Sequence, residues 1–170
     1  MTRRGGFTLL EVLLVAGLMC VLAAVVLPAT APIYERAALR RQAARVATLL
    51  AEARETAFSE GQVRWVRCES GGPALLAGVE GEGFAIEFAL EDAIAFDVAD
   101  DADRLAEWEL GDGLSDYRDL SWSPAVLFFP DGSSSGGRVP VVDDSGRTLT
   151  VEISALTGRA EITAGGDDEA

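Results

Sequence analysis

The chain has 170 residues, with 28 acidic residues against 14 arginines, and it contains neither lysine nor histidine. This length leaves room for one modest domain after an apolar N-terminal stretch. The lack of histidine excludes Ser–His and Cys–His catalysis, which needs an imidazole as general base. We therefore expect a protein that is not an enzyme, with no catalytic residues and no cofactor.

The charge is distributed unevenly along the chain. Residues 1–60 carry seven arginines and five acidic residues, whereas residues 61–170 carry seven arginines and 23 acidic residues, a net charge of −16. A domain this acidic repels the phosphates of nucleic acids, so we expect no nucleic-acid partner. The acidic run Asp97–Asp103 lacks the spacing and the glycine of a calcium-binding EF-hand loop. We interpret it as solvent-exposed charge and predict no metal site.

The first predicted element is an apolar helix over residues 7–31. Phe7 to Leu27 is almost wholly apolar and would measure about 31 Å as a helix, close to the hydrocarbon thickness of a bilayer. Arg3 and Arg4 precede it, which predicts a cytoplasmic N-terminus and translocation of the remainder. Glu11 interrupts the apolar run, and an ionisable residue at such a place is a functional candidate by default.

The alternative for this segment is a conventional secretory signal, cleaved after Ala29-Thr30-Ala31. Its apolar region would be longer than such signals usually have, and it would contain Glu11. Pro32 would also directly follow the cut, which is a poor substrate geometry. We therefore favour a helix that is retained in the mature protein.

The segment Gly6-Phe7-Thr8-Leu9-Leu10-Glu11-Val12 resembles the class III signal of type IV pilins and type II secretion pseudopilins. The resemblance implies that residues 1–6 are a leader, cleaved between Gly6 and Phe7 by prepilin peptidase. It also implies N-methylation of the new terminus, Phe7. In a bundle of such helices, Glu11 of one subunit can face the terminal amine of a neighbour. That pairing offsets the cost of a buried charge and fixes the register between subunits, so we interpret Glu11 as an assembly residue.

The second predicted element is an amphipathic helix over residues 32–60. Pro28 and Pro32 are expected to bend or loosen the chain before it. Gly61 is expected to end the helix. Its apolar residues recur at spacings of three and four, as in a helix that packs on the sheet of its own domain. They are Leu39, Ala43, Val46, Leu50, Ala53 and Ala57.

The sequence pattern predicts a β domain over residues 61–164 and an acidic tail over residues 165–170. Apolar residues alternate over 84–90 and 149–153, and shorter strand patterns occupy 63–65, 94–96, 125–129, 139–142 and 160–162. Turn residues separate these strands at short intervals, which indicates an antiparallel sheet or sandwich. The fold class is thus α+β, with residues 97–124 as a long connection. We expect Cys68 to be buried and not to form a disulfide with Cys20.

The C-terminal half carries a second resemblance. Phe128-Phe129-Pro130-Asp131-Gly132, the Ser/Gly run 133–137 and Leu156-Thr157-Gly158-Arg159 resemble the corresponding half of H-type minor pseudopilins. We interpret the Ser/Gly run as a flexible hairpin loop. The resemblance implies a long helix packed on β-sheets, with a single span of the inner membrane and a periplasmic domain. It implies assembly into the pseudopilus of a type II secretion system.

The partners that the resemblance implies are other major and minor pseudopilins, prepilin peptidase, inner-membrane lipid, and the secretion channel or a secreted protein. Two alternatives remain open. One is a minor pilin of a type IV pilus, acting in pilus priming or DNA uptake, although Arg159 alone provides little positive charge for DNA. The other is a membrane-tethered periplasmic binding module.

Overall fold

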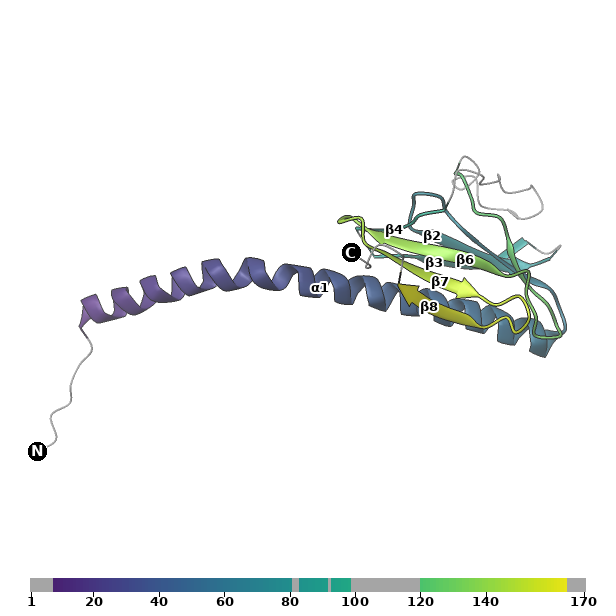
Figure 1. Cartoon of the computed structure of the whole chain (residues 1–170), viewed down its shortest axis with the longest axis horizontal. Helices are drawn as coiled ribbons and strands as arrows, with labels where there is room; N and C mark the ends of the chain where they lie inside the picture. The colour runs from purple at the N-terminus through teal and green to yellow at the C-terminus, as the bar shows by residue number, and fades with distance from the viewer. Residues whose placement is uncertain (1–7, 81–82, 92, 99–119, 165–170) are drawn as a thin grey trace, which may run out of the picture. The chain divides into compact units, whose positions relative to one another are not determined.

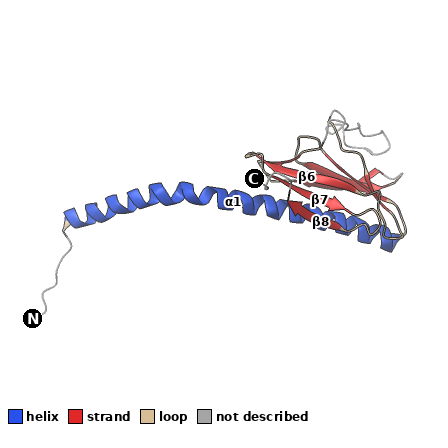
Figure 2. Cartoon of the chain, viewed as in Figure 1, coloured by secondary structure: helices blue, strands red, loops and turns tan. Residues whose placement is uncertain are grey.

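The computed structural model describes residues 8–80, 83–91, 93–98 and 120–164, and it confirms an α+β fold with antiparallel sheets (Figures 1 and 2). The chain divides into two compact units, residues 1–37 and 38–170. The elements follow the order helix, then strands. They are α1 (Leu9–Glu60), β1 (Arg64–Cys68), β2 (Ala74–Val79), β3 (Gly83–Ala89), β4 (Ile94–Phe96), β5 (Val126–Phe128), β6 (Gly137–Asp143), β7 (Thr148–Ile153) and β8 (Ala160–Ala164).

Helix α1 continues through Pro28 and Pro32, so neither proline ends it. A bend at these positions stays a prediction. The helix ends where expected, because Gly61 adopts a φ of 69° and donates its N–H to the carbonyl of Ala57 at 3.0 Å. This left-handed conformation is the usual one for a glycine that terminates a helix.

The predicted apolar stripe of α1 is confirmed within the second unit. All six of its residues are buried, none with more than 4 % of its surface exposed. They pack into one core with side chains from both sheets. Figure 1 shows this part of α1 running alongside the strands. Burial of apolar surface contributes about 25 cal/mol per Å² to the free energy of folding. Burial of such a stripe is therefore the main contribution that holds a helix to a sheet.

The strands form two four-stranded antiparallel sheets. One has the order β3-β2-β1-β5 and the other the order β4-β6-β7-β8. Every strand predicted from the sequence is present, but β2 was missed. All six residues of β2 are buried, so its sequence reads as a continuous apolar run without the alternation that indicates a half-exposed strand. β2 nevertheless pairs with both β1 and β3.

Strand β1 divides two clusters of apolar side chains. Val66 and Cys68 face the main core under α1, whereas Trp65 belongs to a second cluster with Leu76 and Trp122. The indole Nε1–H of Trp65 donates to the carbonyl of Val79 at 3.2 Å. The sheet that contains β1 is therefore covered by apolar side chains on both faces, which fixes its position against α1.

Candidate assembly site

The first turn of α1 presents Glu11 next to a capping residue. Thr8 lies just before the helix, and its Oγ1 accepts a hydrogen bond from the backbone N–H of Glu11 at 3.3 Å. Its carbonyl accepts from the N–H groups of Glu11 at 3.1 Å and Val12 at 3.2 Å. Thr8-x-x-Glu11 also has the sequence pattern of a capping box. Sequence reasoning missed this role of Thr8, although the pattern could have revealed it.

The side chains around Glu11 are apolar and exposed. From Leu9 to Leu22 the large apolar residues expose between 47 % and 79 % of their surface, and Glu11 is exposed among them. A helix that is apolar on all sides requires an apolar environment to cover it. In the part of the chain that the structure describes, no helix qualifies as long and apolar enough to span a membrane. Gly6 and Phe7, the predicted processing residues, lie outside the described residues.

Arg54 joins α1 to two turns of the C-terminal half. Its Nε–H is shared between the carbonyls of Thr157 at 2.8 Å and Gly132 at 3.1 Å. Both turns belong to the motifs that resemble H-type minor pseudopilins. The motifs therefore meet at one arginine of the helix, a residue that the sequence analysis did not single out.

The glycines of these two turns both adopt a left-handed backbone conformation, and at Gly158 a close approach to backbone also excludes a side chain. At Gly158, which has a φ of 59°, an added Cβ would lie 2.7 Å from the carbonyl oxygen of Gly132 and 3.0 Å from Cδ of Arg54. At Gly132, which has a φ of 84°, it would lie 3.1 Å from an Nη atom of Arg54. Since L-residues with a side chain rarely adopt this backbone conformation, the motif glycines have a structural explanation.

The Ser/Gly run 133–137 is tied down by hydrogen bonds, so the prediction of a flexible hairpin loop is wrong. Ser134 is buried, and its Oγ–H donates to the carbonyl of Ser154 at 3.1 Å. Ser133 donates its hydroxyl and its backbone N–H to Oδ1 of Asp131. These two bonds lower the pKa of the Asp131 carboxyl. The serines thus satisfy the polar groups of an ordered turn.

Cys68 is buried, as predicted, and both it and the exposed Cys20 are free thiols. Burial raises the pKa of Cys68 to about 12, although a hydrogen bond with Ser123 acts in the opposite direction. A thiol with such a pKa stays protonated at neutral pH and is a poor nucleophile.

Among the described residues, no group of three or more His, Cys, Asp or Glu side chains is placed to hold a metal ion. Of the acidic run, Asp97 is exposed, whereas Asp100, Asp101 and Asp103 lie outside the described residues.

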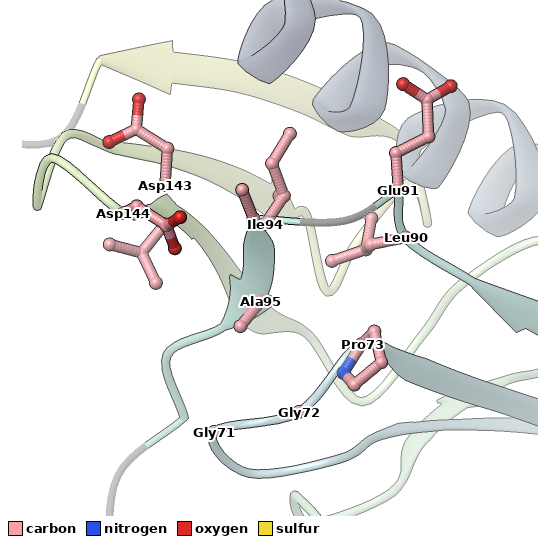
Figure 3. A pocket seen from close by; sticks show the side chains of 11 residues that line it. Gly71, Gly72, Pro73, Leu90, Glu91, Ile94, Ala95, Asp143 and Asp144 are labelled. Carbon is pink, nitrogen blue, oxygen red and sulfur yellow. The ribbon is translucent and has the colours of Figure 1, made fainter. Parts of the chain in front are cut away.

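A shallow pocket of about 320 Å³ opens on the second unit between the β1–β2 turn, the β3–β4 connection and the end of β6. Figure 3 shows Asp143 and Asp144 on one side of Ile94 and Leu90, and Glu91 on the other. Burial disfavours the charged form of Asp143, but hydrogen bonds from Arg147 and from backbone amides outweigh it and hold the pKa of Asp143 below its ordinary value.

The family model of the type II transport protein GspH matches residues 42–157, which is more than half of the chain. The chain belongs to this family. The match contains Arg54 and both turns that it joins, and it confirms the resemblance to H-type minor pseudopilins.

A solved structure has the same fold. It is the minor pseudopilin EpsH from the type 2 secretion system of Vibrio cholerae, with a TM-score of 0.52 and 14 % sequence identity. The similarity covers 75 % of this chain and 98 % of that one. A comparison with curated protein sequences gives no match.

Proposed function

We propose that this protein is a non-enzymatic minor pseudopilin that assembles into the periplasmic pseudopilus of a type II secretion system. The observation that carries the proposal is a helix exposed and apolar on all sides at its start, with one carboxylate at Glu11, followed by a GspH-family domain. The family is that of a type II transport protein, which supports this function over that of a type IV minor pilin.

In this proposal Phe7 to about Leu27 anchors the subunit in the inner membrane, and the same segment later forms part of the filament core. The N-terminus lies in the cytoplasm and the β domain in the periplasm. The exposed apolar side chains from Leu9 to Leu22 support this arrangement, because water is a poor environment for them. Other major and minor pseudopilins, prepilin peptidase and the secretion channel or its cargo are the proposed partners.

Glu11 sets the register of assembly by pairing with the amine of a neighbouring subunit. Cleavage after Gly6 creates that amine at Phe7, and N-methylation keeps it cationic. In the isolated chain Glu11 is exposed, so the charge becomes costly only when the apolar helices bundle around it. An unpaired buried charge costs several kcal/mol, and the amine supplies the missing partner.

The first experiment determines the N-terminus. The protein is extracted from membranes of cells with prepilin peptidase, and its intact mass and terminal sequence are measured. We expect a chain that begins at an N-methylated Phe7. A mature chain that begins at Met1 or at Pro32 contradicts the proposal.

The second experiment separates the charge of Glu11 from its position in the capping pattern. Glu11→Gln keeps a side chain that suits a capping box but removes the charge, whereas Glu11→Ala removes both. Both variants leave the neighbour's amine unpaired in the apolar bundle. We expect each to lower incorporation into isolated pseudopili at least about tenfold, because about 1.4 kcal/mol corresponds to a factor of ten and an unpaired buried charge costs more.

Glu55→Ala is the matched control, because Glu55 is an exposed glutamate of the same helix within the second unit. Its incorporation should equal that of the wild type. Normal incorporation of Glu11→Gln would contradict the role of the charge, and impaired incorporation of Glu11→Ala alone would mean that assembly requires capping at this position.

A further inference from the structure

Strand β8 forms an open edge of its sheet. It stands at the end of the order β4-β6-β7-β8, as Figure 1 also shows, and Glu161 to Ala164 are exposed. Among the described residues, the backbone of β8 bonds only to β7. At the opposite end of the sheet, by contrast, Phe96 of β4 forms backbone hydrogen bonds with Gly71 and Gly72, each at 2.9 Å. The edge at β8 therefore remains available to another strand.

The register of the β7–β8 pair determines which backbone groups face the open edge. Ser154 donates its N–H to the carbonyl of Arg159 at 2.9 Å, in register with this pair of strands. In an antiparallel pair every second residue exchanges hydrogen bonds with the neighbouring strand, so Glu161 and Thr163 direct their backbone groups towards β7. The N–H and C=O groups of the alternate residues point away from β7. These residues are Ala160, Ile162 and Ala164.

A row of charged side chains crosses this sheet and ends at the open edge. Arg138 of β6 lies opposite Glu152 of β7, and the two side chains form an ion pair at 2.9 Å. Glu161 of β8 lies opposite Glu152 on the other side, and it has no ion pair with a described residue. Like charges in directly opposite positions are destabilising. The row thus has one carboxylate more than it has cations, and a cation beyond Glu161 would balance it.

We propose that an extended segment of another protein adds to β8 as a further antiparallel strand, with a basic residue opposite Glu161 and an apolar residue on each side of it. The segment bonds to the outward backbone groups of Ala160 and Ile162, so Glu161 lies between two hydrogen-bonded pairs. Opposite side chains come closest at such a position, which suits an ion pair. The apolar residues of the segment lie beside Ile162, whose surface is 44 % exposed.

The partner is a protein other than this chain. The added segment needs a basic residue between two apolar side chains, and its backbone must be free to pair. Among the described arginines, Arg45, Arg64 and Arg67 have apolar side chains on both sides. Arg45 lies in α1, and the other two lie in β1, which already pairs with β2 and β5. The described part of a second copy therefore offers no free strand of this kind. The contact is also independent of Glu11, because β8 belongs to the second unit.

A synthetic peptide tests the contact with the full chain in detergent. The peptide is Thr-Val-Arg-Val-Thr with a fluorophore, and it is titrated to about 1 mM because a short added strand binds weakly. Binding should slow amide hydrogen exchange, measured by NMR, at Ala160 and Ile162. Exchange at Glu161 and Thr163 should change less, since their N–H groups already face β7. Absence of this alternating pattern would overturn the proposal.

A backbone-methylated peptide is the matched control for hydrogen bonding. It carries N-methyl groups on both valines, whose N–H groups face β8 in the proposed pairing, and it keeps the charge and the side chains. Fluorescence anisotropy should show that it binds at least about fivefold more weakly, a ratio that corresponds to about 1 kcal/mol. Equal binding of the two peptides would mean that the acidic surface attracts arginine without strand addition, and would contradict the proposal.

Charge reversal tests the position opposite the arginine of the peptide. The wild type should bind the arginine peptide at least about fivefold more tightly than a peptide with glutamate in its place. Glu161→Arg should abolish or reverse this preference. Glu80→Arg makes the same change of charge at an exposed residue directly after β2, and it should keep most of the preference. Equal effects of the two variants would show that net charge, and not the β8 edge, selects the peptide.

Discussion

Replacement of Gly158 by alanine should destabilise the β domain. The new Cβ would lie 2.7 Å from the carbonyl oxygen of Gly132 and 3.0 Å from Cδ of Arg54. The left-handed backbone, with a φ of 59°, costs alanine about 1 kcal/mol. Relief of the contact requires the two turns to separate, which adds about 1–3 kcal/mol of strain or lost hydrogen bonding. We expect a total loss of about 2–4 kcal/mol.

Gly146→Ala is the matched control for Gly158→Ala. Gly146 has a φ of 78°, but an added Cβ there meets nothing within 4 Å, so the control incurs only the conformational cost. Urea unfolding of the full chain in detergent can be followed by the fluorescence of the buried Trp65 and Trp122. The free energy of unfolding should fall by at least about 1 kcal/mol more for Gly158→Ala than for Gly146→Ala. Equal losses would refute the argument that close approach to Arg54 explains the motif glycine.

The same unfolding assay checks three further predictions. Arg54→Met keeps the aliphatic stem but removes the donor to both turns, and it should lower the free energy of unfolding by about 1–2 kcal/mol; an unchanged value would contradict the role of Arg54. Asp143 has a lowered pKa in the folded state, so its ionised form stabilises the fold above its ordinary pKa, and the stabilisation is lost as pH falls through the lower folded pKa. Asp143→Asn should therefore destabilise at pH 7 by about 1–2 kcal/mol and approach the wild type once the pH has fallen below the folded pKa of Asp143; a loss independent of pH would contradict the ionic explanation. Gln42 is fully buried, and neither polar atom of its side chain bonds a described residue, so Gln42→Leu should stabilise by about 1–2 kcal/mol; destabilisation would mean that this amide has a partner.

The amphipathic half of α1 could be predicted from the sequence almost completely. Its apolar residues repeat with the helical period, and packing on a sheet selects the same stripe, so local pattern and tertiary structure agree. Gly61 ended the helix as expected because only a glycine adopts its backbone conformation at little cost. The strands with alternating residues were found for the same reason, since one face of each is less buried than the other.

What the sequence did not reveal depends on contacts between distant segments. β2 has both faces buried and so has no period to detect. Arg54 resembled any other surface arginine, because its two acceptors lie 78 and 103 residues away in the chain. The Ser/Gly run has the composition of a flexible loop, whereas its hydroxyls form hydrogen bonds with backbone atoms of Leu127 in β5 and of Ser154 just after β7. No local rule anticipates such bonds.

The two regions that resemble pseudopilins therefore have different physical explanations. The C-terminal motifs are accounted for within the chain, since their glycines and carbonyls fit around Arg54. The start of α1 is not explained by contacts within the chain, because its apolar side chains and Glu11 remain exposed in the single subunit. A feature that is satisfied within the subunit explains stability, whereas one that remains unsatisfied there needs a membrane or another subunit. This contrast is the physical reason why we propose that the start of α1 acts in assembly, whereas the Arg54 turns contribute to stability.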